Sequence, residues 1–205
     1  MCERPDFDRA QNTATELLLQ QHIDSLFIDV RTFHFNKRIK IDSIQNFAQT
    51  VSKPITDFTC NEFSGCCVIL HPRCNLILYD DEEPNEYRKH WGIAHEVGHI
   101  YLGHETDGEK EEKEAHFFTA QIVMPEIVLH NIEDRCDGLY PEEISDVFNA
   151  SFGSACKRLD TFKRRGCFSS SQRDKMLLAK FRPLLDDIYP SEGVRKQFWD
   201  MVCSA

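Results

Sequence analysis

Apolar residues recur every three or four positions in two N-terminal stretches of the chain, residues 8–21 and 41–51. This spacing predicts an amphipathic helix in each stretch. Two short apolar runs follow, 65–70 and 76–79, and the turn-like residues 71–75 separate them. Such runs predict two strands joined as a hairpin.

Residues 86–103 are apolar on nearly every face, which predicts a helix buried within the core. Glu86 stands at its N-terminal end, where the helix dipole favours an acid, and Gly103 is a suitable C-cap. After a polar loop, a second helix is predicted over 111–124, and Pro125 ends it.

The C-terminal third predicts helices only. Residues 140–149 and 151–165 read as two helices that cross at a short turn, and residues 171–205 as two further helices. The chain is therefore expected to have an α+β fold. We expect a first domain over 1–130 and a helical, helix-turn-helix-like subdomain over 131–205.

Composition narrows the class of protein. The chain has 205 residues, 41% of them hydrophobic, which suffices for a core of ordinary size. Its nine cysteines are odd in number and form no CxxC pair, so we expect reduced thiols and no disulfide framework. The charged N-terminus predicts no signal peptide, and the lack of a long apolar run predicts no membrane span. We therefore expect a cytoplasmic protein.

Charge is unevenly distributed along the chain. The net charge is −10, yet residues 157–182 hold nine Lys and Arg and only two Asp. Such a charge run is usually only a solvated helical face, but this basic segment is the one place where a nucleic acid or an acidic partner could bind. We do not expect direct DNA binding, because the acidic remainder of the chain would repel the duplex.

The helix predicted over 86–103 contains the sequence HExxH, formed by His95, Glu96 and His99. Side chains four residues apart share a helix face, so the two imidazoles can bind one metal ion. Two imidazoles suit Zn²⁺, which in catalytic sites has three protein ligands and a water, and Glu96 is placed to be the general base. The alternative is a core helix with two incidental histidines. Gly98 favours the metal site, because a glycine inside a helix indicates close approach of another element.

A third ligand should come from the second helix. The metzincin pattern does not fit, because His104 falls five rather than six residues after His99 and Leu102 occupies the glycine position. On the second helix, Glu112 shares a stripe with apolar residues, whereas Glu111 and Glu114 are displaced toward solvent. Glu112 is therefore the better candidate ligand.

Residues 88–104, RKHWGIAHEVGHIYLGH, and 112–125, EKEAHFFTAQIVMP, resemble the ImmA/IrrE family of metallopeptidases. That family combines an AHE-GH helix with a helix of the form E-x-x-A-x-x-F-A-x-x-L-L-M-P. The resemblance implies a zincin-like core: a small β-sheet, the HExxH helix and a third-ligand helix. It also implies gluzincin-like zinc binding by His95, His99 and Glu112, with Glu96 as the catalytic base.

The chain departs from the family pattern at two positions: His116 replaces the usual Asn or Asp, and Thr119 replaces an alanine. His116 lies one turn after Glu112, so it could bind the zinc, support Glu112 or face the cleft. A transition-state oxyanion would need a donor besides zinc. The candidate donors or supporting residues are Tyr101, His104, His116 and Tyr140.

The expected function is zinc-dependent hydrolysis of peptide bonds. The resemblance implies a helix-turn-helix transcriptional repressor as the protein substrate, cleaved to relieve repression in a stress response or a mobile element. The alternative is a non-catalytic regulator, with a structural or sensory zinc site and a basic C-terminal module that binds DNA or protein. Glu96 favours the enzyme, since a structural zinc site needs no carboxylate at the base position.

Overall fold

The structure is a computed structural model that describes residues 4–58, 65–71, 73–106, 108–136, 138–166 and 169–190. The chain divides into two compact units. The first comprises Met1–Gln21 and Ile28–Val123, and the second comprises His22–Phe27 and Met124–Ala205. The predicted domain division near residue 130 stays a prediction, because compactness alone does not show that a part folds independently.

The first unit contains a three-stranded sheet in the order β1-β3-β2, with β1 at Ile39–Ser43, β2 at Cys66–Ile69 and β3 at Asn75–Tyr79. Strands β2 and β3 pair antiparallel with Cys67 opposite Leu78, which confirms the predicted hairpin. Strand β1 pairs parallel to β3, with Ile41 opposite Ile77.

The first residues of the helix predicted over 41–51 belong to β1 instead, and helix α2 occupies only Ile44–Val51. Ser43 is the N-cap of α2, and its side chain accepts a hydrogen bond from the amide of Asn46. The helix prediction was wrong at residues 41–43, because pairing with β3, a strand far along the chain, outweighs the local apolar spacing there.

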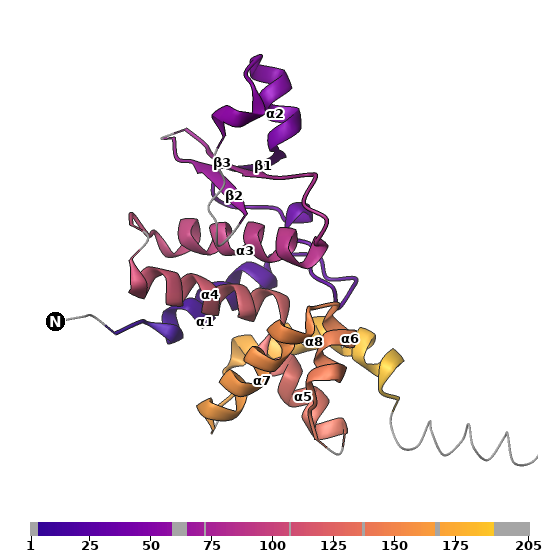
Figure 1. Cartoon of the computed structure of the whole chain (residues 1–205). Helices are drawn as coiled ribbons and strands as arrows, with labels where there is room; N and C mark the ends of the chain where they lie inside the picture. Colours follow the sequence, from indigo (N-terminus) through magenta and orange to yellow (C-terminus); the bar gives the residue numbers. More distant parts are fainter. Residues whose placement is uncertain are drawn as a thin grey trace, which may run out of the picture. The chain divides into compact units, whose positions relative to one another are not determined.

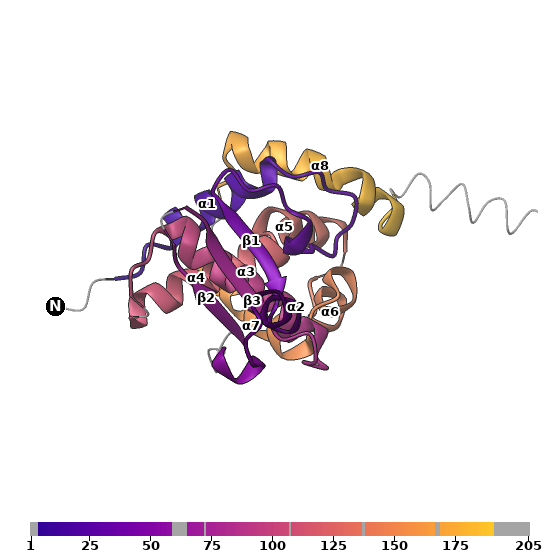
Figure 2. The same cartoon turned by 90° about the horizontal axis from the view of Figure 1, so that it is seen from above.

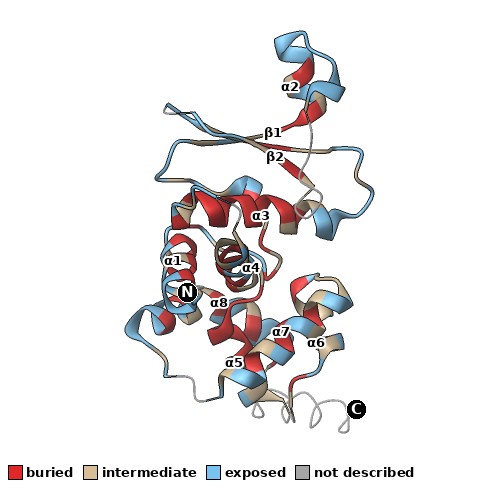
Figure 3. Cartoon of the chain, turned by 60° about the vertical axis from the view of Figure 1, so that its left-hand side comes forward, coloured by how far each residue is buried: buried red, intermediate tan, exposed pale blue. Residues whose placement is uncertain are grey.

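Three longer helices complete the first unit: α1 at Phe7–Leu19, α3 at Glu86–Leu102 and α4 at Glu109–Val123. Helix α3 lies between the sheet on one side and α1 and α4 on the other (Figure 1), and the strands cross over it when seen from above (Figure 2). It is exposed in its first turn and largely buried from His90 to Leu102 (Figure 3). The prediction of a buried helix over 86–103 is therefore confirmed, and the α+β fold class with it.

Helices α3 and α4 approach each other closely at Gly98. A Cβ atom placed there would lie 2.9 Å from Cδ1 of Phe118 and 3.5 Å from the Cα of Ala115. Phe118 and Ala115 are themselves fully buried, so neither can move away. The close approach expected at Gly98 is confirmed.

The second unit is helical, with α5 at Glu126–Arg135, α6 at Pro141–Phe148, α7 at Phe152–Arg165 and α8 at Gln172–Ile188. Helices α6 and α7 pack together across a turn at Asn149, whose φ of 48° lies in the left-handed region. The predicted pair of helices at 140–165 is confirmed. Helix α5, which packs against α8, was not predicted. The second of the two helices expected after residue 171 falls mostly outside the described residues.

One arginine of the basic segment, residues 157–182, lies in the interior of the second unit. Arg158 is buried, and its Nε donates a hydrogen bond to the carbonyl oxygen of Met124 over 3.0 Å. Burial lowers the pKa of Arg158 to about 10. Arg158 is therefore not available for a surface-bound nucleic acid.

Two further findings concern the described residues only. No helix among them is both long and apolar enough to cross a membrane. The cysteines described as free thiols are Cys66, Cys67, Cys74, Cys136 and Cys156.

Candidate metal centre

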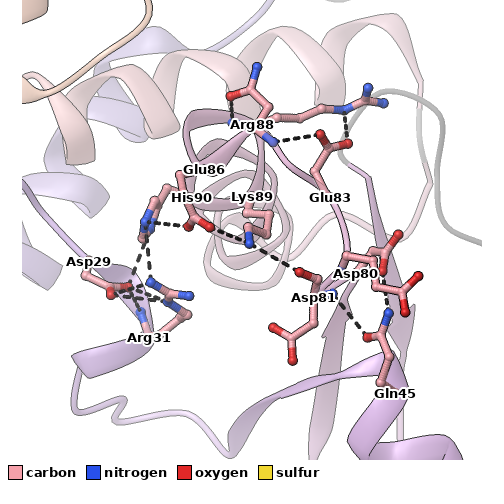
Figure 4. Close-up of polar contacts among 12 residues, drawn as sticks. Asp29, Arg31, Gln45, Asp80, Asp81, Glu83, Glu86, Arg88, Lys89 and His90 are labelled. Carbon is pink, nitrogen blue, oxygen red and sulfur yellow. Dashed lines mark hydrogen bonds and ion pairs between the residues drawn. The ribbon is translucent and has the colours of Figure 1, made fainter.

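A polar cluster holds the N-terminal end of α3 in place (Figure 4). Nδ1 of His90 lies 3.6 Å from Oδ1 of Asp29, and its Nε2 lies 3.4 Å from Nη2 of Arg31. Burial alone would raise the pKa of Asp29, but the hydrogen bonds from His90 and Arg31 hold it well below its usual value. Arg88 and Lys89 pair with Glu83 and Glu86 in the same cluster. The start of α3 is thus tied to the segment around residue 30 and to the loop after β3.

Two cations hold the C-terminal end of α3. The helix ends at Gly103, whose φ of 68° is the left-handed conformation of a C-cap glycine. Lys37 donates to the carbonyl oxygen of Ile100 over 2.6 Å, and Arg9 donates to that of Leu102. Cations bound to the last carbonyls compensate the negative end of the helix dipole. The helix that bears HExxH is therefore fixed at both ends.

The structure brings His95, His99 and Glu112 together. The Nε2 atoms of His95 and His99 lie 3.0 Å apart. Oε2 of Glu112 lies 3.3 Å from Nε2 of His95, and its Oε1 lies 3.4 Å from Nε2 of His99. The two histidines come from one face of α3 and the glutamate from the first turn of α4. Among the described residues, this is the one group of three or more such side chains that could hold a metal ion.

The donor set fits zinc. Two imidazole nitrogens and one carboxylate are the ligands of many catalytic zinc sites, and ligand distances of about 2.0–2.1 Å at tetrahedral angles separate neighbouring ligand atoms by about 3.3 Å. The three separations in this site are close to that value. Burial, together with the neighbouring His116 and His99, lowers the pKa of His95 to about 3, so this imidazole is neutral near pH 7. A neutral imidazole is the form that binds a metal.

Glu96 is buried next to His95 on α3 and lies within electrostatic reach of β2. Burial raises the pKa of the Cys67 thiol, and the carboxylate of Glu96 raises it further. Cys67 belongs to β2, an edge strand of the described sheet. The expected base therefore lies on the metal-ligand helix and within electrostatic reach of a strand at the sheet edge.

The four further candidates have different surroundings. The ring centroid of His116 lies 4.6 Å from that of His95, on the exposed side of α4. Nδ1 of His104 lies 3.1 Å from Nδ1 of His99, behind the ligand. The Tyr101 hydroxyl donates to Oδ1 of Asn36 over 2.8 Å. Tyr140 belongs to the second unit and is 60% exposed.

The expectation that Glu114 faces solvent is wrong, since its side chain is only 1% exposed. Its Oε2 lies 3.0 Å from Nε2 of His104, and its Oε1 accepts the backbone N–H of Asp6 over 2.8 Å. The error came from assigning α4 a single buried face. Helix α4 packs against both α3 and α1, and Glu114 lies on the α1 side together with Phe117, whose ring contacts that of Phe7. Glu114 and Phe117 are three positions apart, and this spacing is the sequence signal for that second face.

Sequence reasoning also missed Asp6 and Arg9, because no local pattern in α1 points to a partner on α4. The side chain of Asp6 accepts from the amide of Arg9 as the N-cap of α1, a common local motif. Its contact with Glu114 spans 108 residues and exists only in the folded chain.

An α+β unit that presents two histidines of HExxH and a glutamate from the next helix is the arrangement of a metallopeptidase-type domain. Residues 67–160 match the model of the IrrE N-terminal-like domain family, Peptidase M78. The predicted resemblance to the ImmA/IrrE family is thereby confirmed. No curated protein and no solved structure gave a match to the chain.

Proposed function

We propose that the chain is a zinc-dependent endopeptidase with His95, His99 and Glu112 as the zinc ligands. The observation that carries this proposal is the convergence of these three side chains within a domain of the peptidase family. A zinc ion bound there would act as a Lewis acid toward a water molecule and the substrate carbonyl.

We assign proton transfer and stabilisation of the oxyanion to residues of the chain itself. Glu96 accepts the proton of the attacking water and returns it to the leaving amine as a general acid. His116 lies beside His95 on the exposed side of α4, and it is the donor we assign to the developing oxyanion. His104 faces Glu114 rather than the exposed side, so its role is support of His99.

The substrate is proposed to bind in an extended conformation along β2. This strand has β3 as its only described strand neighbour, and its Cys67 lies within electrostatic reach of Glu96. A peptide added to that edge would gain main-chain hydrogen bonds and bring a peptide bond toward the metal ligands. From the family resemblance, the proposed substrate is a helix-turn-helix transcriptional repressor, and the proposed place of action is the cytoplasm.

Substitution of Glu96 by Gln tests the proposal. An amide can hydrogen-bond a water molecule but cannot accept its proton, so Glu96→Gln should keep zinc and abolish cleavage. Wild type and variant are incubated with purified candidate repressors, new N-termini are identified by mass spectrometry, and bound zinc is measured in parallel. Cleavage by the variant at the wild-type rate would refute the assignment of Glu96. A zinc-loaded wild type that cleaves no repressor of the set would favour the non-catalytic regulator.

A further inference from the structure

A continuous chain of polar contacts leads from the candidate metal ligand His99 to the N-terminal helix. Nδ1 of His99 lies 3.1 Å from Nδ1 of His104, and Nε2 of His104 lies 3.0 Å from Oε2 of Glu114. Oε1 of Glu114 accepts the backbone N–H of Asp6 over 2.8 Å. We propose that His104, Glu114 and the start of α1 are positioning elements that hold His99 in its metal-binding orientation.

The protons along this chain have one consistent arrangement. If Nε2 of His99 is to bind a metal ion, its proton must be on Nδ1, which then donates to Nδ1 of His104. The proton of His104 is then on Nε2 and is donated to the carboxylate of Glu114. Each donor in this arrangement meets an acceptor. A ligand histidine whose second nitrogen is hydrogen-bonded is held in one tautomer and one ring orientation.

The carboxylate of Glu114 is itself fixed by α1. A buried carboxylate is costly unless several donors surround it. Here the donors are His104 and the amide of Asp6, and the guanidinium of Arg9 lies 4.0 Å from Oε2. Arg9 also donates to the carbonyl of Leu102 at the end of α3, so one side chain connects α1 to both helices of the site.

Packing brings α1 close enough to make these contacts. Ala10 and Ala14 of α1 are fully buried, and the ring centroids of Phe7 and Phe117 lie 4.9 Å apart. Helices α1 and α4 lie side by side on the face of α3 opposite the sheet (Figure 1). The N-terminal helix therefore belongs to the metal centre as well as to the hydrophobic core.

The two candidate histidine ligands differ in this respect. Nδ1 of His95 is buried and has no hydrogen-bond partner among the described residues. Its ring contacts His99 and His116 instead, with centroids at 4.7 and 4.6 Å. The contacts of His104 and Glu114 thus act on His99 alone, and their loss should change the orientation of one ligand without removing any.

The inference rests on the proposed zinc site. It is tested first by the affinity of the protein for zinc ions in the absence of any substrate. Glu114→Gln keeps the size of the side chain, but one of its two terminal atoms becomes an NH2 donor, so the hydrogen bonds to Oε1 and to Oε2 cannot both be kept. We expect zinc affinity, measured by competition with a chelator, to fall about 10- to 100-fold. The matched control is Glu109→Gln, the same change on the same helix at a side chain that is 73% exposed, and its affinity should equal that of wild type.

Two further variants keep the test decisive if Glu114→Gln folds poorly. His104→Phe keeps a ring of similar shape without nitrogen atoms, and its loss of affinity should not add to that of Glu114→Gln, because both act through one chain of contacts. Arg9→Gln should lower the affinity, whereas the exposed Arg4→Gln should not. Wild-type zinc affinity in folded Glu114→Gln and His104→Phe would overturn the proposal.

The tautomer of His99 separates this inference from the proposed function. In metal-free wild type, ¹⁵N NMR of the imidazoles should show His99 protonated on Nδ1, and Glu114→Gln should give a mixture of tautomers. A change in general stability alone would not alter the tautomer. If wild type binds no zinc, the proposed function fails, and this measurement still decides whether the contacts orient His99. An unchanged tautomer in Glu114→Gln would overturn the inference.

Discussion

At the scale of single residues, two glutamates on α4 that are two positions apart have different surroundings. The carboxylate of Glu112 is 24% exposed and lies between the Nε2 atoms of His95 and His99. The carboxylate of Glu114 is buried behind His99, with His104 and the amide of Asp6 as its partners. A rotation of about 200° around the helix separates the two side chains. One is thereby placed to bind a metal ion and the other to orient a ligand.

Metal content distinguishes these roles. We expect wild type to hold about one zinc ion per chain and Glu112→Gln to lose it, because the loss of one of three protein ligands removes most of the binding free energy. The loss should exceed that of Glu114→Gln. Glu111→Gln is the control, with zinc retained and stability changed by no more than about 0.5 kcal/mol. Elemental analysis after zinc loading measures this, and wild-type zinc content in Glu112→Gln would rule out Glu112 as a ligand.

At the scale of elements, the geometry of the candidate metal centre depends on the spacing between α3 and α4. Helix α3 is held by the Asp29–His90 cluster at one end and by Arg9 and Lys37 at the other. The distance from α3 to α4 is set where Gly98 meets the ring of Phe118. A side chain at position 98 would therefore have to displace Phe118 or the backbone of α4, the helix that carries Glu112.

Gly98→Ala tests this dependence. Alanine gains about 1 kcal/mol of helix propensity, whereas overpacking of a rigid core costs about 1–3 kcal/mol. We expect a lower free energy of unfolding in urea and a weaker affinity for zinc. The matched control is Gly153→Ala on α7, where an added Cβ would meet no atom within 4 Å and stability should stay equal or rise. A Gly98→Ala variant with wild-type stability and zinc affinity would contradict the argument.

At the scale of the whole molecule, the buried site makes stability depend on pH. The pKa of His95 is about 3 in the folded protein, compared with an ordinary value of 6.5. Below pH 6.5 the unfolded chain binds a proton at this imidazole and the folded chain does not. The contribution of His95 to the free energy of unfolding is therefore complete above pH 6.5 and is lost as the pH falls toward 3.

Urea unfolding of the metal-free protein between about pH 7.5 and about pH 4.5 should show this loss as a positive slope of stability against pH. His95→Gln, which cannot titrate, should have a smaller slope, and the difference between the two slopes isolates His95 from other groups. Zinc should steepen the wild-type slope further, because protons compete with the metal for the same nitrogen. Equal slopes in metal-free wild type and His95→Gln would contradict the assigned pKa.

The sequence alone determined the features that are encoded locally. The HExxH spacing, the apolar surroundings of α3 and the position of Gly98 predicted a buried helix with a neighbour in close contact, and the β2–β3 hairpin followed from two apolar runs and a turn. Helical geometry together with the family resemblance indicated Glu112 as the third ligand; its carboxylate lies beside His95 and His99, and its role as a ligand stays a prediction. The predictions of the buried helix and the hairpin succeeded because each depends on residues a few positions apart.

Only the tertiary structure decided the features that depend on distant partners. Residues 41–43 have helical spacing but form a strand, because β3 pairs with them. A proline can end one helix or stand at the start of another. Pro125 does both, and helix α5, which begins directly after it, packs against α8. Glu114 is buried because α1 covers α4, a contact across 108 residues. Local periodicity reports that a face is apolar, but the identity of its partner is fixed only when the whole chain has folded.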